Sequence, residues 1–166
     1  MKYYFKRKNL ITNELNKYCL VDAAGNKVYD WKSSILLTKK IRIFDANKNE
    51  VAVVKQVLKS LMPKYQIFVN GEMVLEIKKE FHPLLAKYTL NGSGWEMDNQ
   101  LMLFEYGMKK DGETVLTQRE VEEHMFSQCQ TYELDVNGYT NEVVAVAAAV
   151  AINFGIEGDK MDMRNG

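Results

Sequence analysis

Two basic side chains in the first half of the chain have a spacing that suits the binding of an anion. Lys40 and Arg42 alternate with Ile41 and Ile43, so in a β-strand both cations would lie on the face opposite the two isoleucines. Arg can hold a phosphate through two parallel hydrogen bonds, and Lys adds a compact positive charge. Together with the preceding Lys39, these residues form a candidate phosphate-binding site. An ordinary solvated strand face would show the same pattern.

No group of residues has the spacing of a catalytic site. The nucleophile-elbow motif G-x-S-x-G of serine hydrolases is absent, and the Gly-rich segment 91–94 lies between two expected strands, which does not suit a phosphate loop. Four carboxylates could supply a glycosidase pair, although an acidic solvated loop accounts for the first three: Glu120, Glu122, Glu123 and Glu133. We therefore predict no catalytic residues and no enzymatic activity.

The scarcity of His and Cys argues against a metal centre. The chain has two of each, and His124 with Cys129 would supply one pair of ligands without a second pair. Cys19 and Cys129 both lie in strand-like segments, where a free Cys acts as a small hydrophobic residue. We predict no metal, no cofactor and two reduced thiols, which is typical of a cytoplasmic protein.

Charge is balanced over the whole chain but not along it. The 22 Lys and Arg equal the 22 Asp and Glu, which argues against nucleic acid as a partner because nucleic-acid-binding domains are usually strongly basic. Residues 1–64 contain 14 basic and 5 acidic residues, whereas residues 65–166 contain 8 and 17. This split predicts either one basic and one acidic face or cross-strand ion pairs between the halves.

Length and apolar segments indicate one domain without a transmembrane segment. A chain of 166 residues has the usual size of a single domain, and residues 2–8 are too charged for a signal peptide. The longest apolar run, Val143–Ile152, has ten residues, whereas a membrane-spanning helix needs about 20.

Alternating apolar residues, a polar turn and a second alternating run recur along the chain, which predicts β-hairpins. Asn70-Gly71 is the clearest turn, because both central residues of a type I′ turn need positive φ. The repeats follow one another too closely for crossover helices, so the sheet should be antiparallel. The expected strand pairs are 18–22 with 27–31, 41–45 with 50–55, 65–69 with 72–78, 86–90 with 95–98, and 101–106 with 113–118, before a last strand at 131–136.

The C-terminal segment has a different pattern. Val143–Ile152 contains only Ala, Val and Ile, and a helix that is apolar all round must be buried on every side. We predict a central helix over residues 139–154 that ends at Gly155, with the strands closed around it. The expected domain covers residues 1–158, followed by a flexible tail over residues 159–166.

The repeated hairpins, followed by Tyr132-Glu133-Leu134-Asp135-Val136 and an Ala/Val-rich helix, resemble the LURP-one-related proteins. These proteins belong with the Tubby C-terminal domains and the phospholipid scramblases. The resemblance covers residues 3–154, and it is closest to short bacterial-type members, which have no assigned activity. It implies a mainly β fold, a closed antiparallel barrel of twelve strands around a central hydrophobic C-terminal helix.

Two functions of different classes remain open, and the resemblance bears on the first. Tubby domains bind phosphoinositides and scramblases act at membranes, so Lys39, Lys40 and Arg42 become candidates for holding a lipid headgroup. Such a protein would dock on anionic membrane lipid from the cytoplasm, peripheral to the membrane. The alternative is a protein-interaction or structural module that binds another protein or a second copy of itself. Neither function requires catalysis.

Overall fold

The structure is a computed structural model of the chain, and it describes residues 1–7, 18–34, 39–57, 59–80, 87–102, 105–121, 131–138 and 141–165. Within these ranges the chain forms twelve β-strands followed by one α-helix. The elements are β1 (Lys2–Arg7), β2 (Tyr18–Asp22), β3 (Lys27–Ser34), β4 (Lys40–Asp45), β5 (Glu50–Val57), β6 (Lys64–Val69), β7 (Glu72–Glu80), β8 (Lys87–Asn91), β9 (Trp95–Met102), β10 (Glu105–Lys110), β11 (Glu113–Val121), β12 (Thr131–Val136) and α1 (Glu142–Asn165).

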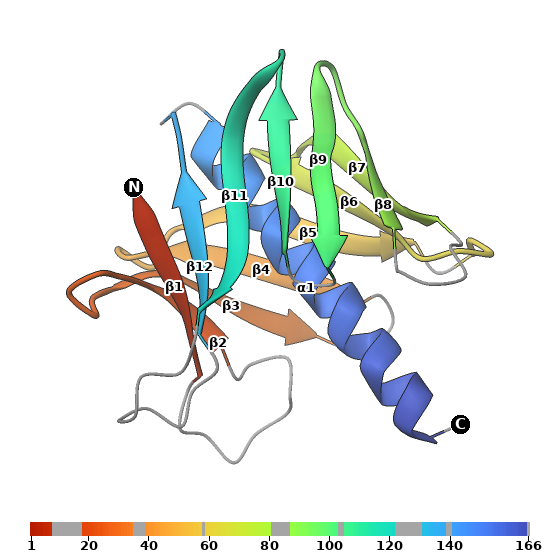
Figure 1. Cartoon of the computed structure of the whole chain (residues 1–166), viewed down its shortest axis with the longest axis horizontal. Helices are drawn as coiled ribbons and strands as arrows, with labels where there is room; N and C mark the ends of the chain where they lie inside the picture. The colour runs from red at the N-terminus through yellow and green to blue at the C-terminus, as the bar shows by residue number, and fades with distance from the viewer. Residues whose placement is uncertain are drawn as a thin grey trace.

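All twelve strands belong to one antiparallel sheet that wraps around the helix (Figure 1). Apart from β8 and β9, each strand pairs with its neighbours in sequence, and β1 pairs with β12, so the first strand lies beside the last. The described residues show no ladder pairing between β8 and β9, so the barrel is nearly closed and has its seam at this hairpin. The predicted fold class, a mainly β antiparallel barrel with a C-terminal helix, is confirmed.

The short turns of the β2–β3, β4–β5, β6–β7 and β10–β11 hairpins lie at one end of the barrel, because consecutive strands run in opposite directions. Asn70 and Gly71 both have positive φ (52° and 79°), as a type I′ turn requires. Two other turns share a different device, in which an Asp carboxylate accepts backbone N–H groups two and four residues later. Asp22 does this for Ala24 and Asn26, at 2.9 Å each. Asp45 makes the same bonds to Asn47 and Asn49.

The turn before β11 is shorter than the sequence suggested. We expected residues 107–112 to form a loop, but β10 continues to Lys110 and only Asp111-Gly112 make the turn, both with positive φ. Gly107 lies inside the strand, opposite Thr117 on β11. A Cβ at Gly107 would stand 3.4 Å from the Asp98 side chain. That distance is an ordinary van der Waals contact, so Gly107 is a strand residue at a position with room for a Cβ, and its glycine does not mark a turn.

The centre of the helix forms the middle of the core. Every residue from Ala145 to Ile152 is at most 3% exposed, whereas Val143 and Val144 are half-buried. Figure 1 shows the helix passing between β9–β12 in front and β3–β5 behind. The expected all-round burial therefore holds from Ala145 to Ile152, whereas Val143 and Val144, in the first helical turn, keep some exposure to solvent.

The helix ends differ from the expected range of 139–154. The helix begins at Glu142 and continues past Gly155 to Asn165, so Gly155 does not end it and residues 159–165 are helical. A glycine inside a helix costs only about 1 kcal/mol relative to Ala, and no Pro follows to stop the helix. The extent of the domain, residues 1–158, stays a prediction.

Candidate functional site

The candidate phosphate-binding residues lie where β4 begins, and their surroundings differ: Lys39, Lys40 and Arg42. Ile41 and Ile43 are 5% and 0% exposed and point into the barrel, so Lys40 and Arg42 lie on its outer face. Arg42 is exposed, but its guanidinium pairs with the carboxylate of Glu50 and lies 5.5 Å from the Phe44 ring. Lys39 is exposed just before the strand. The charge of Arg42 is therefore already neutralised by a partner within the sheet.

The register places Lys40 among lysines from other strands. The start of β4, the end of β5, the start of β6, the end of β7 and the start of β8 lie at one end of the sheet, because neighbouring strands are antiparallel. We call this group the lysine end. It consists of Lys39, Lys40, Lys55, Lys59, Lys64, Lys78, Lys79 and Lys87, and the acidic residues among the same strand ends are Glu76 and Glu80.

Two pairs of lysines at this end face each other directly across neighbouring strands. Lys40 is opposite Lys55 on β5, and Lys64 is opposite Lys78 on β7. Like charges in directly opposite positions destabilise a sheet. Two contacts reduce the repulsion: the Lys55 ammonium lies 4.3 Å from the centre of the Phe68 ring, and the Lys64 ammonium lies 4.0 Å from a Glu76 carboxylate oxygen.

The β1–β12–β11 side of the barrel shows the opposite arrangement. Glu133 on β12 lies directly opposite Arg119 on β11, and its carboxylate is 3.0 Å from Arg119 and 3.1 Å from Lys2. Burial alone would raise the pKa of Glu133, but the cations Lys2 and Arg119 and the Tyr4 hydroxyl together lower it. The sequence indicated Glu133 as a possible catalytic carboxylate. In the structure it forms ion pairs between neighbouring strands of the barrel.

The remaining candidates for chemistry do not assemble into a site within the described residues. Glu120 is exposed on β11, whereas Glu122, Glu123, His82, His124 and Cys129 lie outside the described residues. Cys19 is buried and forms no disulfide with any described residue. In the part of the chain that the structure describes, no three His, Cys, Asp or Glu side chains could hold a metal ion together.

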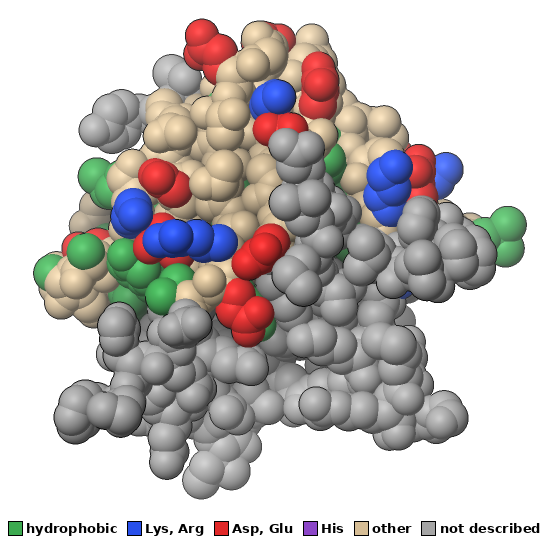
Figure 2. Space-filling view, in the orientation of Figure 1, with side chains coloured by type: hydrophobic (Ala, Val, Ile, Leu, Met, Phe, Trp, Pro, Cys, Tyr) green, Lys and Arg blue, Asp and Glu red, His purple; other side chains and the backbone are tan. Residues whose placement is uncertain are grey.

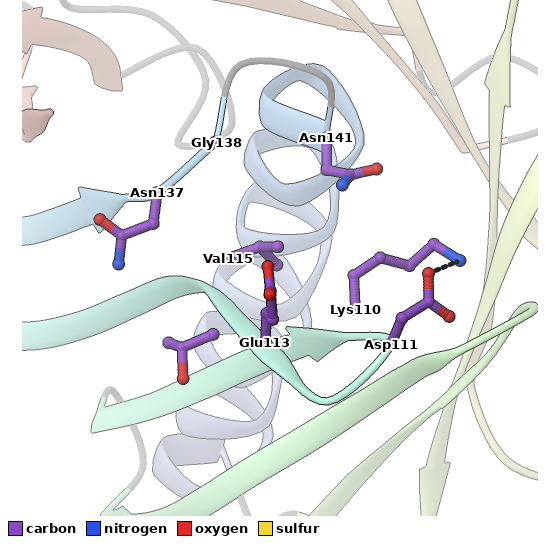
Figure 3. Close-up of a pocket in the computed structure, with 8 residues that line it drawn as sticks. Lys110, Asp111, Glu113, Val115, Asn137, Gly138 and Asn141 are labelled. Atoms are coloured by element: carbon purple, nitrogen blue, oxygen red, sulfur yellow. Dashed lines mark ion pairs between the residues drawn. The ribbon is translucent and has the colours of Figure 1, made fainter.

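A polar depression lies at the other end of the barrel, beside the start of α1 (Figure 3). It has a volume of about 440 Å³ and is lined by the β10–β11 turn and the segment before the helix. Its cation, Lys110, pairs with Asp111 at 3.2 Å and donates to the Ser93 carbonyl. Because Lys110 is engaged in these contacts, the depression does not offer a free positive charge to an anionic ligand.

Figure 2 shows mixed charge on the face formed by β9–β12, where Lys and Arg lie next to Asp and Glu. The ion pairs on this side include Lys109 with Asp98 at 3.3 Å, as well as the Glu133 pairs. At the lysine end, by contrast, eight lysines lie among the same strand ends as two acidic residues, Glu76 and Glu80. Lys39 and Lys40 belong to this group. The sequence did not indicate its other members, because they lie on other strands or in the β5–β6 connection and become neighbours only in the folded sheet. They are Lys55, Lys59, Lys64, Lys78, Lys79 and Lys87.

These features define a class of protein: a nearly closed antiparallel barrel built around a hydrophobic C-terminal helix. The chain belongs to the LURP-one-related family, whose sequence model matches residues 1–153. This match confirms the resemblance seen in the hairpins and the Ala/Val-rich helix. The chain is also similar to the uncharacterized protein YxjI of Bacillus subtilis (strain 168), with 25% identity over 124 residues that make up 75% of each chain.

A search of the solved structures found no match to this chain. Within the described residues, none of the helical structure has the combination of length and hydrophobicity needed to cross a bilayer. Neither the family nor the fold specifies a ligand or partner, so we infer the role of the protein from the charged residues on its surface.

Proposed function

We propose that this protein is a non-enzymatic module that docks on anionic lipid headgroups through the lysine end. The observation that supports the proposal is that two pairs of lysines lie directly opposite each other on neighbouring strands, Lys40 with Lys55 and Lys64 with Lys78. Such pairs weaken a sheet, and an anionic surface would relieve the repulsion. Opposite charges lie across strands elsewhere in the barrel, as Arg119 and Glu133 show, and at the β7–β8 edge of the lysine end, where Glu80 lies opposite Lys87.

The number of lysines suits weak and reversible docking. Each Lys or Arg near an anionic membrane contributes about 1 kcal/mol, so three or four that act together give measurable binding. Screening acts over about 8 Å at physiological ionic strength, so this binding should weaken as salt increases. Arg42 is expected to contribute less than Lys39 or Lys40, because its guanidinium already pairs with Glu50.

Co-sedimentation with vesicles tests this function. The variant Lys39→Ser/Lys40→Ser/Lys55→Ser should bind anionic vesicles at least about tenfold more weakly than the parent, because it removes three of the lysines. A matched control, Lys27→Ser/Lys48→Ser/Lys109→Ser, removes the same charge from the turn end of the barrel, where Lys27 and Lys109 pair with Asp30 and Asp98. The control variant should bind like the parent.

The outcomes separate the two classes of function. Lipid docking is supported if the parent binds only vesicles that contain anionic lipid and if only the lysine-end variant loses this binding. Equal losses in both variants would show an effect of net charge alone and would contradict a site at the lysine end. No binding by the parent at low salt would favour the alternative, a protein-interaction or structural module that recognises another protein or a second copy.

A further inference from the structure

Leu61 is the most exposed large apolar side chain of the described residues. It lies in the connection between β5 and β6, and its relative exposure of 104% means that the rest of the protein covers none of it. The hydrophobic atoms at the right-hand edge of Figure 2 lie where Figure 1 places this connection. A single exposed Leu is common on a protein surface, so its meaning depends on what surrounds it.

Lysines of the lysine end flank Leu61 on both sides of the connection. Lys59 precedes it by two residues and is exposed, and Lys64 opens β6 three residues later. Lys78 lies directly opposite Lys64, so further positive charge stands beside the base of the connection. An uncovered apolar side chain within a group of cations matches the chemistry of a bilayer, in which anionic headgroups lie above apolar chains.

Backbone hydrogen bonds hold both ends of the connection that carries Leu61. The Pro63 carbonyl accepts a hydrogen bond from the Lys79 backbone N–H at 3.0 Å. On the other side, the Gln56 N–H donates to the Lys39 carbonyl at 2.9 Å. These bonds join the connection to β4 and β7, the strands that carry several of the lysines.

We propose that Leu61 inserts into the interfacial layer of an anionic membrane while the surrounding lysines hold the headgroups. This inference rests on the proposed function and narrows it, because it names a lipid bilayer as the partner. A free phosphate or a soluble inositol phosphate would satisfy the lysines without any contact to Leu61. Insertion adds a contribution that salt does not screen, because burial of an apolar side chain does not depend on charge.

A Leu61→Trp variant measures insertion directly. The native tryptophans, Trp31 and Trp95, are only 5% and 7% exposed, so a change in emission on vesicle addition would report residue 61. We expect a blue shift with anionic vesicles and quenching by lipids that carry bromine in their acyl chains. Soluble inositol hexakisphosphate should produce neither change. Emission that stays unshifted and unquenched while the protein co-sediments with vesicles would overturn the inference and leave the proposed function intact.

Leu61→Ser gives a second readout with a matched control. It should weaken vesicle binding about tenfold, the change expected when a buried Leu is lost, and the loss should persist at high salt. The control Met73→Ser removes the 54% exposed Met73 at the turn end of β7 and should leave binding unchanged. Equal binding by Leu61→Ser and the parent would refute insertion. Failure of the parent itself to bind anionic vesicles would refute both the insertion and the proposed function.

Discussion

Glu133 connects the first strand of the barrel to the last two. Its side chain is 8% exposed and accepts charged contacts from Lys2 on β1 and Arg119 on β11. Burial works against the charged form, but these cations and the Tyr4 hydroxyl outweigh it and hold the pKa of Glu133 below its ordinary value of 4.5. A group whose pKa is lowered by folding stabilises the folded state above its unfolded pKa, and that stabilisation is lost as pH falls through the folded pKa.

We predict that Glu133→Gln lowers the free energy of unfolding by about 1 kcal/mol at neutral pH, since both cations are themselves about half exposed. The difference between parent and variant should shrink as pH falls below 4.5, because the parent then also loses the charge. Urea unfolding over a pH series measures this difference. Glu120→Gln, on the adjacent strand with an exposed side chain, serves as the control. A difference that stays constant down to acid pH would contradict the assignment.

At the scale of the element, α1 combines an apolar surface with two polar attachments. At its start, Glu142 accepts hydrogen bonds from the hydroxyls of Tyr3 and Tyr29 at 2.7 and 2.8 Å. About three turns later, Asn153 and Gln118 exchange two amide hydrogen bonds of 2.9 Å, and the Tyr106 hydroxyl donates to Asn153. These contacts set the depth and rotation of a helix whose small apolar residues would otherwise allow sliding.

We predict that Ala148→Asp prevents folding. Ala148 is 0% exposed at the centre of the helix, and a buried charge without a partner is strongly destabilising, by several kcal/mol. Circular dichroism and thermal melting should show loss of the cooperative transition. The control Ala24→Asp places the same charge in an exposed turn and should melt like the parent. A cooperatively melting Ala148→Asp protein would be incompatible with a helix at the centre of the barrel.

At the scale of the whole molecule, the chain order is also the order around the barrel. The basic first part of the chain forms β1–β5 as one sector, and the acidic remainder forms most of β6–β12 as another. The sectors meet at β5–β6 and at β1–β12. Opposite charges pair at the second boundary, where Lys2 contacts Glu133, so the charge split produces both a basic sector and ion pairs between the halves.

The seam between β8 and β9 leads to a prediction about hydrogen exchange. Strands β1 and β12 pair on both sides, whereas the described parts of β8 and β9 pair with β7 and β10 and not with each other. Amides that face the seam should therefore exchange at least about tenfold faster than those in the β1–β12 ladder, because local opening requires breaking fewer bonds. Exchange followed by NMR measures both sets. Equal protection in the two places would indicate a fully closed barrel.

Local properties of the sequence determined the hairpins and the helix. Asn70-Gly71 forms the expected turn because positive φ at both positions is a property of these two residues. The apolar surface of Ala145–Ile152 required burial on every side, which implied a barrel closed around a helix. The helix end at Asn165 was not predictable, because a glycine at 155 weakens a helix without stopping it.

The candidate site depended on the tertiary structure. The sequence indicated Lys40 and Arg42 because they alternate with two isoleucines, with Lys39 beside them, but the lysine opposite Lys40 belongs to another strand and becomes its neighbour only through register. The same register gave Arg42 the partner Glu50. Strand alternation is local and can be seen in one segment, whereas cross-strand neighbours depend on where two segments meet. The sequence by itself therefore determined the architecture of this protein, and only the tertiary structure decided which charges are paired and which face each other at the lysine end.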